Sequence, residues 1–275
     1  MKALAALALL AAVALPSAHA AGGVPPFAHV VVIVFENKEE QQVVGAREAP
    51  TFTRLAGVYA RLRDYHGVAH PSLPNYLALV SGATHGIRSD CTSCTVSARN
   101  LADTLEQAGR TWKTYAEGLP RPGFTGAFAG RYAKKHDPFL YFRDVAGSAA
   151  RRRNVVPFTQ LAADLRAQQL PDFALVVPDL CHSMHDCSVR TGDRWLARTI
   201  PPLLDVPNTA VFVTFDEGSI PNHVPALVLG TAVKPRSSFA PRTNHYGLLR
   251  TIEDAWRLPP LGASGRVKPI TGIWR

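Results

Sequence analysis

Residues 29–37 have the sequence HVVVIVFEN. The run from His29 to Phe35 is continuous, apolar after its first residue and rich in β-branched side chains, which is typical of a strand buried on both faces, as in a parallel sheet. The run is followed directly by Glu36 and Asn37, whose side chains carry oxygen atoms. Because ligands of open α/β sheets bind beyond the carboxyl ends of the strands, this stretch predicts a buried strand that ends at a functional edge.

Three further runs have the same continuous apolar character, and amphipathic patterns lie between them. The strands are expected at 173–177, 210–215 and 226–229, and the helices at 51–61, 101–108, 158–168, 194–204 and 246–256. Alternating strands and helices predict an α/β fold with helices on both faces of the sheet. The expected architecture is a three-layer α/β/α sandwich with a mostly parallel central sheet.

Composition and charge narrow the classes to which the protein can belong. Of its 275 residues, 47% are hydrophobic and 19% charged, which argues against disorder. The formal net charge of +9 favours phosphates, nucleic acid or anionic lipid surfaces as partners, without choosing among them. The sequence has no Gly-x-Gly-x-x-Gly motif, no Walker loop and no Gly-x-Ser-x-Gly elbow, so dinucleotide-binding, NTP-binding and α/β-hydrolase functions lose support.

The first 20 residues have the features of a secretory signal peptide. Lys2 supplies a positive charge, residues 3–15 are apolar, and residues 18–20 form an Ala-x-Ala pattern. The apolar stretch is too short for a spanning helix; a retained N-terminal anchor is the alternative. We expect a periplasmic or secreted protein in which residues 21–275 form one domain, with no nucleic acid as partner and at most transient contact with a membrane surface. The oligomeric state is left open.

The chain has four cysteines: Cys91, Cys94, Cys181 and Cys187. An even number in an exported protein predicts two disulfides, for which three connectivities exist. We favour the local pairs Cys91 with Cys94 and Cys181 with Cys187. A four-cysteine zinc site is the alternative, but the five-residue spacing of the second pair fits it poorly.

Acidic residues also follow two other predicted strands. Asp179 comes after the run 173–177, and Asp216 and Glu217 come directly after the run 210–215. Two adjacent carboxylates repel each other, so holding both at a strand end favours a bound cation. Together with Glu36 and Asn37 they form an all-oxygen set suited to Ca²⁺, Mg²⁺ or Mn²⁺, with Zn²⁺ an option if histidines join. Separate surface acids are the alternative interpretation.

The segment 70–76, HPSLPNY, contains a candidate nucleophile. Leu73 and Pro74 can open a helix with Ser72 at its N-cap. A serine there lies beside free backbone N–H groups and the positive end of the helix dipole, which favour an anion. A phosphoryl group bound there would lie in line with the Ser72 oxygen, and Asn75 could donate to it. A plain serine N-cap is the alternative.

Histidines and further charges gather in three places. Residues 179–186 contain His182, His185 and Asp186, and a disulfide between Cys181 and Cys187 would hold this loop in a small ring. Residues 134–137, KKHD, could clamp a phosphate or lie on the surface. His245 begins the last helix behind the expected cap Asn244, where a histidine tends to stay neutral.

Six segments, taken in order, resemble a known family. They are VFEN (34–37), HPSLPNY (70–76) with SG (81–82), YAKKHDP (132–138), VPD (177–179) with MHD (184–186), TFDE (214–217) and NHYGLLRTIED (244–254). The chain resembles the bacterial phosphoesterase family of secreted acid phosphatases and phospholipases C, within the alkaline phosphatase superfamily. The resemblance extends over about residues 27–274 and implies an alkaline phosphatase-like fold.

The resemblance implies a role at each matching position. Ser72 stands where the family has its phosphoryl-accepting residue, and Asn75 where it holds a phosphoryl oxygen. The implied metal ligands are Glu36, Asn37, Ser72, Asp216 and Glu217. The implied catalytic set is Ser72, Asn75, His136, His185 and His245. Where the family often has Asn-Asp, this chain has His182 and Ser183, so Asp179, His182 and Asp186 form a candidate second metal or phosphate site.

These residues imply hydrolysis of phosphate monoesters by a secreted acid phosphatase. A divalent metal ion, either Ca, Mg, Mn or Zn, would lower the pKa of the Ser72 hydroxyl, and a phosphoserine would form and then be hydrolysed. His185 or His245 would protonate the leaving group. The expected partners are phosphorylated small molecules or lipid headgroups, phosphoinositides among them. The alternatives are a phosphodiesterase or phospholipase C, and a periplasmic protein that binds phosphate or lipid headgroups without catalysis.

Overall fold

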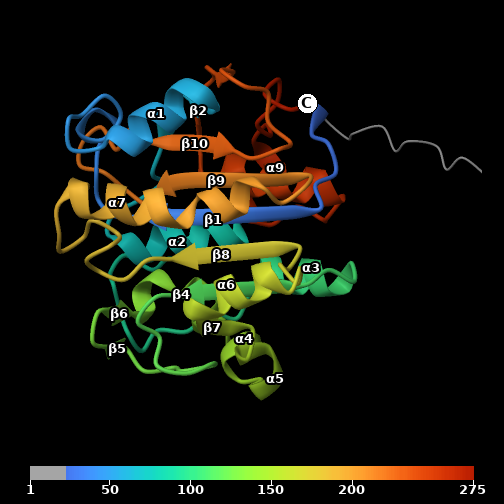
Figure 1. Ribbon diagram of the computed structural model, residues 1–275. Helices are drawn as coiled ribbons and strands as arrows, with labels where there is room; N and C mark the ends of the chain where they lie inside the picture. Colours follow the sequence, from blue (N-terminus) through green and yellow to red (C-terminus); the bar gives the residue numbers. More distant parts are fainter. Residues whose placement is uncertain (1–22) are drawn as a thin grey trace, which may run out of the picture.

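The computed structural model describes residues 23–275, so the expected signal peptide at 1–20 lies outside the described residues. An eight-stranded sheet forms the centre, with strand order β11-β2-β10-β9-β1-β8-β4-β7 (Figure 1). The strands are β1 His29–Phe35, β2 Ala60–Leu62, β4 Trp112–Ala116, β7 Val155–Pro157, β8 Phe173–Val177, β9 Thr209–Phe215, β10 Ala226–Leu229 and β11 Ser238–Phe239.

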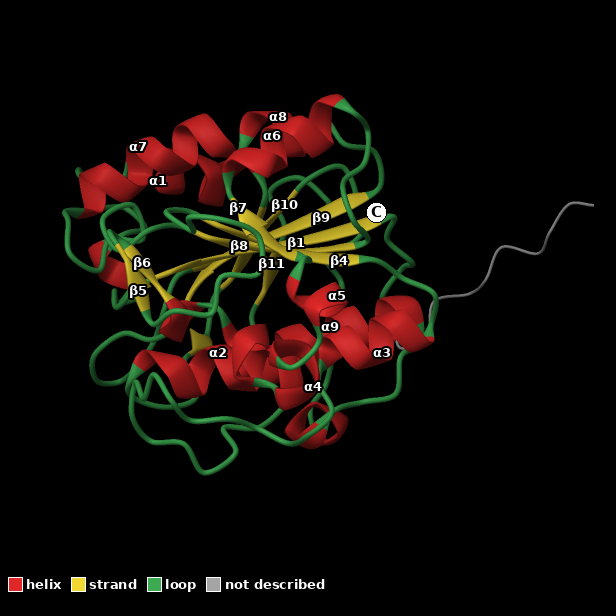
Figure 2. Ribbon diagram, turned by 90° about the horizontal axis from the view of Figure 1, so that it is seen from below, coloured by secondary structure: helices red, strands yellow, loops and turns green. Residues whose placement is uncertain are grey.

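Helices cover both faces of this sheet, which gives the expected three layers (Figure 2). On one face lie α1 Pro50–Val58, α6 Thr159–Arg166, α7 Val189–Thr199 and α8 Pro201–Leu204. On the other lie α2 Ser72–Ser81, α3 Leu101–Gln107, α4 Arg143–Ala146 and α9 His245–Trp256, with α5 Ala149–Arg152 beside them. Within residues 23–275, no helix combines the length and apolar character that a membrane span requires.

The sheet is mostly parallel, as the continuous apolar runs predict. β1 pairs in parallel with β8 on one side and with β9 on the other, and β4 pairs in parallel with β8 and β7. β10 is antiparallel to both β9 and β2. The short strands β2, β4, β7 and β11 gave no continuous apolar run in the sequence, because each is brief or carries polar residues such as Lys113.

The predicted helices begin and end within three residues of the observed bounds, except in one segment. The pattern at 194–204 predicted one helix, but α7 begins earlier, at Val189, and a separate helix, α8, begins at Pro201. Ser188 caps the true start by accepting from the Thr191 N–H. Pro201 has no N–H to continue the ladder and fits best in a first turn, so it opens α8.

Aromatic packing fixes the carboxyl ends of β1 and β9. The ring centroid of Phe35 lies 5.2 Å from that of Phe52 on α1, 5.4 Å from Phe215 on β9 and 5.7 Å from Trp195 on α7. All four side chains are buried, and each such ring stabilises the fold by roughly 2–3 kcal/mol. The residues that follow Phe35 and Phe215 therefore leave the sheet from a rigid base.

Glu253 on α9 is a buried acid that generates a prediction about stability. Its carboxylate accepts from the Leu261 N–H (2.9 Å) and the Ser264 hydroxyl (2.7 Å). Burial raises the pKa of Glu253 to about 7. Between its ordinary pKa and this value the folded chain holds a proton that the unfolded chain has lost, so this contribution to stability falls as the pH rises.

Glu253→Gln keeps the size of the side chain and the Oε1 that accepts from the Leu261 N–H, and it removes the ionisation. We expect the free energy of unfolding of the variant, relative to that of the wild type, to rise by about 1–3 kcal/mol between about pH 5 and 8. Denaturant unfolding at several pH values measures the difference. Two parallel stability curves would show that Glu253 does not titrate in this range.

Candidate metal and nucleophile site

The site lies where β1 and β9 end side by side. Phe35 is in register with Phe215, so the residues that follow these two strands leave the sheet at the same level. Glu36, Asp216 and Glu217 are all buried there, each with at most 3% of its surface exposed. The strand-end pattern in the sequence therefore located this edge correctly.

Ser72 lies against this group of acids. Its hydroxyl oxygen is 3.0 Å from Glu36 Oε2 and 3.3 Å from Glu217 Oε1, and the side chain is 1% exposed. The expectation that Ser72 is the N-cap of the helix is wrong, because Pro71 holds that position and Ser72 is the first helical residue. Its hydroxyl is directed at the carboxyl groups and not at the N–H groups of its own helix.

Asn37 joins the two acidic strand ends. Its backbone N–H donates to Asp216 Oδ1 (3.2 Å) and its side-chain amide donates to Glu217 Oε1 (3.3 Å). Its φ of 48° lies in the left-handed region, which asparagine tolerates better than most residues. This turn brings the oxygen-bearing residues Glu36, Asn37, Ser72, Asp216 and Glu217 into one group.

Burial raises the pKa values of all three carboxyl groups, and the negative charge of neighbouring acids adds to this effect. Burial, followed by the negative charge of Asp216, raises the pKa of Glu36 well above its usual range. Burial and the charge of Glu217 raise the pKa of Asp216 to about 7, and burial also raises the pKa of Glu217. A bound cation would offset this mutual repulsion.

Two buried polar atoms support a fit between this site and a metal ion. Asp216 Oδ2 and His136 Nε2 have no hydrogen-bond partner among residues 23–275. Such orphaned atoms are uncommon in native interiors and call for an explanation such as an ion. The donor set is dominated by carboxylate, amide and hydroxyl oxygens, which suits the hard divalent cations Ca²⁺, Mg²⁺ and Mn²⁺, while the neighbouring imidazole keeps Zn²⁺ open.

Tyr76 and His136 form the floor beneath Glu36. Tyr76 lies one helical turn after Ser72, and its hydroxyl donates to Glu36 Oε1. His136 stacks on Tyr76 with ring centroids 5.2 Å apart, and its Nε2 lies 3.3 Å from Glu36 Oε1 without the geometry of a hydrogen bond. Burial and the charge of Lys135 lower the pKa of His136 well below its usual value, so its ring is neutral.

Sequence reasoning missed Tyr76 and His70 as parts of the site. His70 Nδ1 forms an ion pair with Glu217 Oε2, from the loop that precedes α2. A signal for Tyr76 did exist, because residues four apart share one face of a helix and Tyr76 is four residues after Ser72. His70 carried no comparable periodic signal.

The sequence suggested that Asn75 could donate to a phosphoryl oxygen, but in the structure its side-chain amide has no free N–H group. Its side-chain NH₂ donates to the carbonyls of Ala69 (2.9 Å) and Pro71 (3.2 Å), and its Oδ1 accepts from the N–H groups of Val68 and Ala69. In this structure Asn75 therefore holds the loop that leads into Ser72.

His245 is likewise fully engaged by the protein. Its Nε2 lies 2.6 Å from the Asp216 carbonyl oxygen and its Nδ1 lies 2.9 Å from the Tyr65 hydroxyl. Burial lowers the pKa of His245 to about 4, which keeps it neutral, as expected for a histidine behind the Asn244 cap. With both nitrogens bonded, His245 positions the Asp216 backbone and has no nitrogen left to protonate a leaving group.

His185 lies at the rim of the site. Its Nδ1 is 2.6 Å from Asp186 Oδ1, which fixes Nε2 as the acceptor of the Lys135 ammonium at 3.3 Å. The His185 ring centroid is 5.9 Å from that of His136. Asp186 therefore orients His185, and the Lys135 ammonium contacts the opposite nitrogen of the ring.

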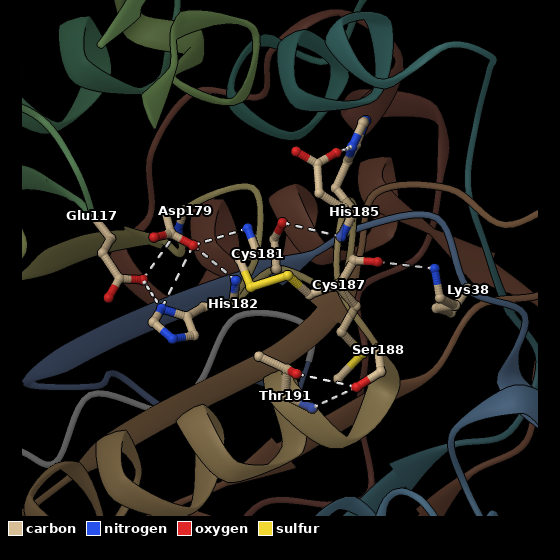
Figure 3. The surroundings of a disulfide bond; sticks show 12 residues. Lys38, Glu117, Asp179, Cys181, His182, His185, Cys187, Ser188 and Thr191 are labelled. Atoms are coloured by element: carbon tan, nitrogen blue, oxygen red, sulfur yellow. Dashed lines mark hydrogen bonds and ion pairs between the residues drawn. A yellow bond between two sulfur atoms is a disulfide. The ribbon is translucent and has the colours of Figure 1, made fainter. Parts of the chain in front are cut away.

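Asp179 and His182 form a separate cluster with Glu117, the residue that follows β4 (Figure 3). His182 Nδ1 lies 2.9 Å from Glu117 Oε2 and 3.5 Å from Asp179 Oδ1. This is a group of candidate metal-ligating side chains within residues 23–275. The sequence had placed Asp186 in this group, but Asp186 pairs with His185 and Glu117 takes the third place.

Both favoured cysteine pairs are disulfides, which excludes a four-cysteine zinc site. Cys181–Cys187 closes the loop that carries His182 and His185 (Figure 3). Lys38 adds a second tie, since its ammonium donates to the carbonyl of Met184 at 3.0 Å. The loop therefore has few ways to move away from the strand ends.

Removing this bridge with Cys181→Ala/Cys187→Ala should lower the free energy of unfolding by about 2 kcal/mol, because the unfolded chain regains the freedom of a small loop. Amide hydrogen exchange within residues 179–188 should also quicken. The matched variant Cys91→Ala/Cys94→Ala should leave exchange in that segment unchanged. Equal exchange in both variants would show that the bridge does not order the loop.

The chain is similar to a known protein family and to named phosphatases. The model of the phosphoesterase family matches residues 43–259. A phosphatidylinositol-3-phosphatase of Mycobacterium tuberculosis is 35% identical over 93% of this chain and 85% of its own length. An acid phosphatase of Aspergillus fumigatus is 30% identical over 76% of this chain, which spans about half (51%) of that longer protein.

Solved structures support the fold. A protein in the alkaline phosphatase superfamily from Vibrio parahaemolyticus matches with a TM-score of 0.60 and 14% identity, over 86% of this chain and 68% of that one. Murine ectonucleotide pyrophosphatase/phosphodiesterase 5 matches with a TM-score of 0.56 and 12% identity, over 85% and 96% of the two chains. From the extent of the family match and the identity to the mycobacterial protein, the chain belongs to the phosphoesterase family.

Proposed function

We propose that the protein is a metal-dependent acid phosphatase that hydrolyses phosphate monoesters through Ser72. The observation that carries this proposal is the position of the Ser72 hydroxyl, buried at the start of α2 and held between two carboxyl groups. The named relatives, a phosphatidylinositol-3-phosphatase and acid phosphatases, support a phosphate monoester as the substrate.

The metal would be held by Glu36, Asn37, Ser72, Asp216 and Glu217. When bound, a divalent cation supplies positive charge that lowers the pKa of a hydroxyl and stabilises charge on phosphoryl oxygens. Glu36 and Glu217 are the nearest acceptors for the proton of Ser72. Asn37 keeps these two strand ends together through its bonds to Asp216 and Glu217.

Ser72 would attack phosphorus and form a phosphoserine, which water then hydrolyses. Lys135 and the first N–H groups of α2 would stabilise charge on the phosphoryl oxygens. Of the two histidines considered for protonating the leaving group, His185 is the better candidate. His185 is exposed at the rim, whereas His245 is buried with both nitrogens bonded within the protein.

The proposed setting is outside the cytoplasm. Two disulfides are typical of exported proteins and agree with the signal peptide expected at residues 1–20. The candidate substrates are phosphorylated small molecules and lipid headgroups, with phosphoinositides suggested by the name of one relative. Residues 21–275 would form a single phosphoesterase domain.

Ser72→Ala tests the nucleophile. With p-nitrophenyl phosphate as substrate, we expect kcat to fall by about 10³ or more, because the covalent route is lost. Ser81→Ala, at the far end of the same helix, is the matched control and should keep a kcat close to the wild type. Near-normal turnover by Ser72→Ala would remove the serine from this role.

Metal binding can be followed without turnover. After dialysis against a chelator, adding Mn²⁺ should raise the thermal unfolding temperature, and a concentration near a hundred times Kd should add about 2.7 kcal/mol of stability. Asp216→Asn should lose most of this shift, because it removes one carboxylate from the group. Glu117→Gln, in the separate cluster, should keep it. The opposite pattern would assign the metal to the Glu117 cluster.

A further inference from the structure

Asp90 bonds to the start of the helix that carries Ser72. The backbone N–H of Leu73, the residue next to Ser72, donates to Asp90 Oδ1 at 3.0 Å. The N-cap residue, Pro71, has no side chain that could accept a hydrogen bond, so a residue from outside the helix satisfies this N–H. A carboxylate is favoured there for the reasons that favour a phosphate: free donors and the positive end of the helix dipole.

The second oxygen of Asp90 holds Lys135. The Lys135 ammonium is 2.8 Å from Asp90 Oδ2 and 3.3 Å from His185 Nε2. Both partners of this ion pair are partly buried, with 13% of the Lys135 side chain and 27% of the Asp90 side chain exposed. The two oxygens of the Asp90 carboxylate therefore bind the Leu73 N–H beside the nucleophile and the Lys135 ammonium at the rim.

The charge of Asp90 reaches the acidic group. The Asp90 carboxylate accepts from the N–H of Leu73, and the hydroxyl of the neighbouring Ser72 lies 3.3 Å from Glu217 Oε1. Asp90 thus adds a further negative charge to the place where a substrate dianion has to bind. At short range and low local dielectric such repulsion costs more than it would in water.

We propose that Asp90 is a built-in competitor of the substrate phosphate, occupying the Leu73 N–H and the Lys135 ammonium until phosphate takes both. This inference rests on the proposed phosphatase function. Substrate binding exchanges one set of hydrogen bonds for another, so no covalent bond changes in this step. Transfer of Lys135 to the phosphate also releases His185 Nε2 from its contact with the Lys135 ammonium. After hydrolysis, Asp90 returns to the same donors and promotes release of inorganic phosphate.

Asp90→Asn separates competition from a purely structural role. The asparagine Oδ1 can still accept from the Leu73 N–H, so the helix start stays capped while the negative charge is lost. We expect the inhibition constant of inorganic phosphate, and its Kd measured by calorimetry on the manganese-loaded protein, to fall about fivefold or more. KM for p-nitrophenyl phosphate should fall as well, and kcat should not rise, because product release slows.

Asp172→Asn is the matched control. Asp172 also accepts a backbone N–H, that of Thr111 (2.9 Å), and also pairs with a cation, Arg110 (2.7 Å), but it lies before β8 at the opposite edge of the sheet. We expect no change in phosphate affinity for this variant. Lys135→Met should shift the affinity the other way and weaken phosphate binding, which gives a second measurement if Asp90→Asn folds poorly.

Two outcomes would overturn the proposal. If Asp90→Asn binds phosphate as the wild type does, or more weakly, while kcat falls, Asp90 only positions the helix. If Lys135→Met leaves phosphate affinity unchanged, no cation is shared between Asp90 and phosphate. Failure of the proposed function would give a different result, because the wild type would then release no phosphate from p-nitrophenyl phosphate. Calorimetry would still compare the Kd of inorganic phosphate between the variants and the wild type.

Discussion

Three carboxyl groups, those of Glu36, Asp216 and Glu217, are buried around a single serine hydroxyl, and much of the surrounding structure keeps them there. Like charges taken out of water repel one another strongly, and here the response is a set of raised pKa values. An arrangement of this kind costs stability unless protons or a cation neutralise it. The orphaned Asp216 Oδ2 favours a cation.

The surrounding structure limits how this group could relax. The buried aromatic side chains Phe35 and Phe215 precede the acidic residues on β1 and β9, so the strand ends cannot separate without opening the core. From the other side, His245 bonds to the Asp216 carbonyl and Tyr76 to the Glu36 carboxyl. Because these contacts come from different elements, the geometry of the site follows from the whole fold.

Much of the fold was predictable because the signal was local. The strands β1, β8 and β10 have the bounds that their apolar runs suggest, since burial on both faces requires a continuous run. α7 was misplaced because its start depends on a Ser188 cap that outweighs the weak apolar pattern of its first turn. The strands at the sheet edges are too short to show any period.

The site was predictable where it depended on strand ends and less so where it depended on side-chain partners. The convergence of Glu36 and Asp216 follows from two parallel neighbours that end at the same level. Nothing in the sequence shows that Asn75 bonds to the backbone of its own loop, or that Asp90 reaches Leu73 from 17 residues away. Such contacts depend on tertiary packing, and single-residue patterns do not encode them.

The most direct test of the central claim is an anomalous scattering map from crystals of the manganese-loaded protein. The account predicts a peak among Glu36, Asn37, Asp216 and Glu217, within bonding distance of the Ser72 hydroxyl. A peak confined to Glu117, Asp179 and His182, with the carboxyl groups around Ser72 left without an ion, would contradict it.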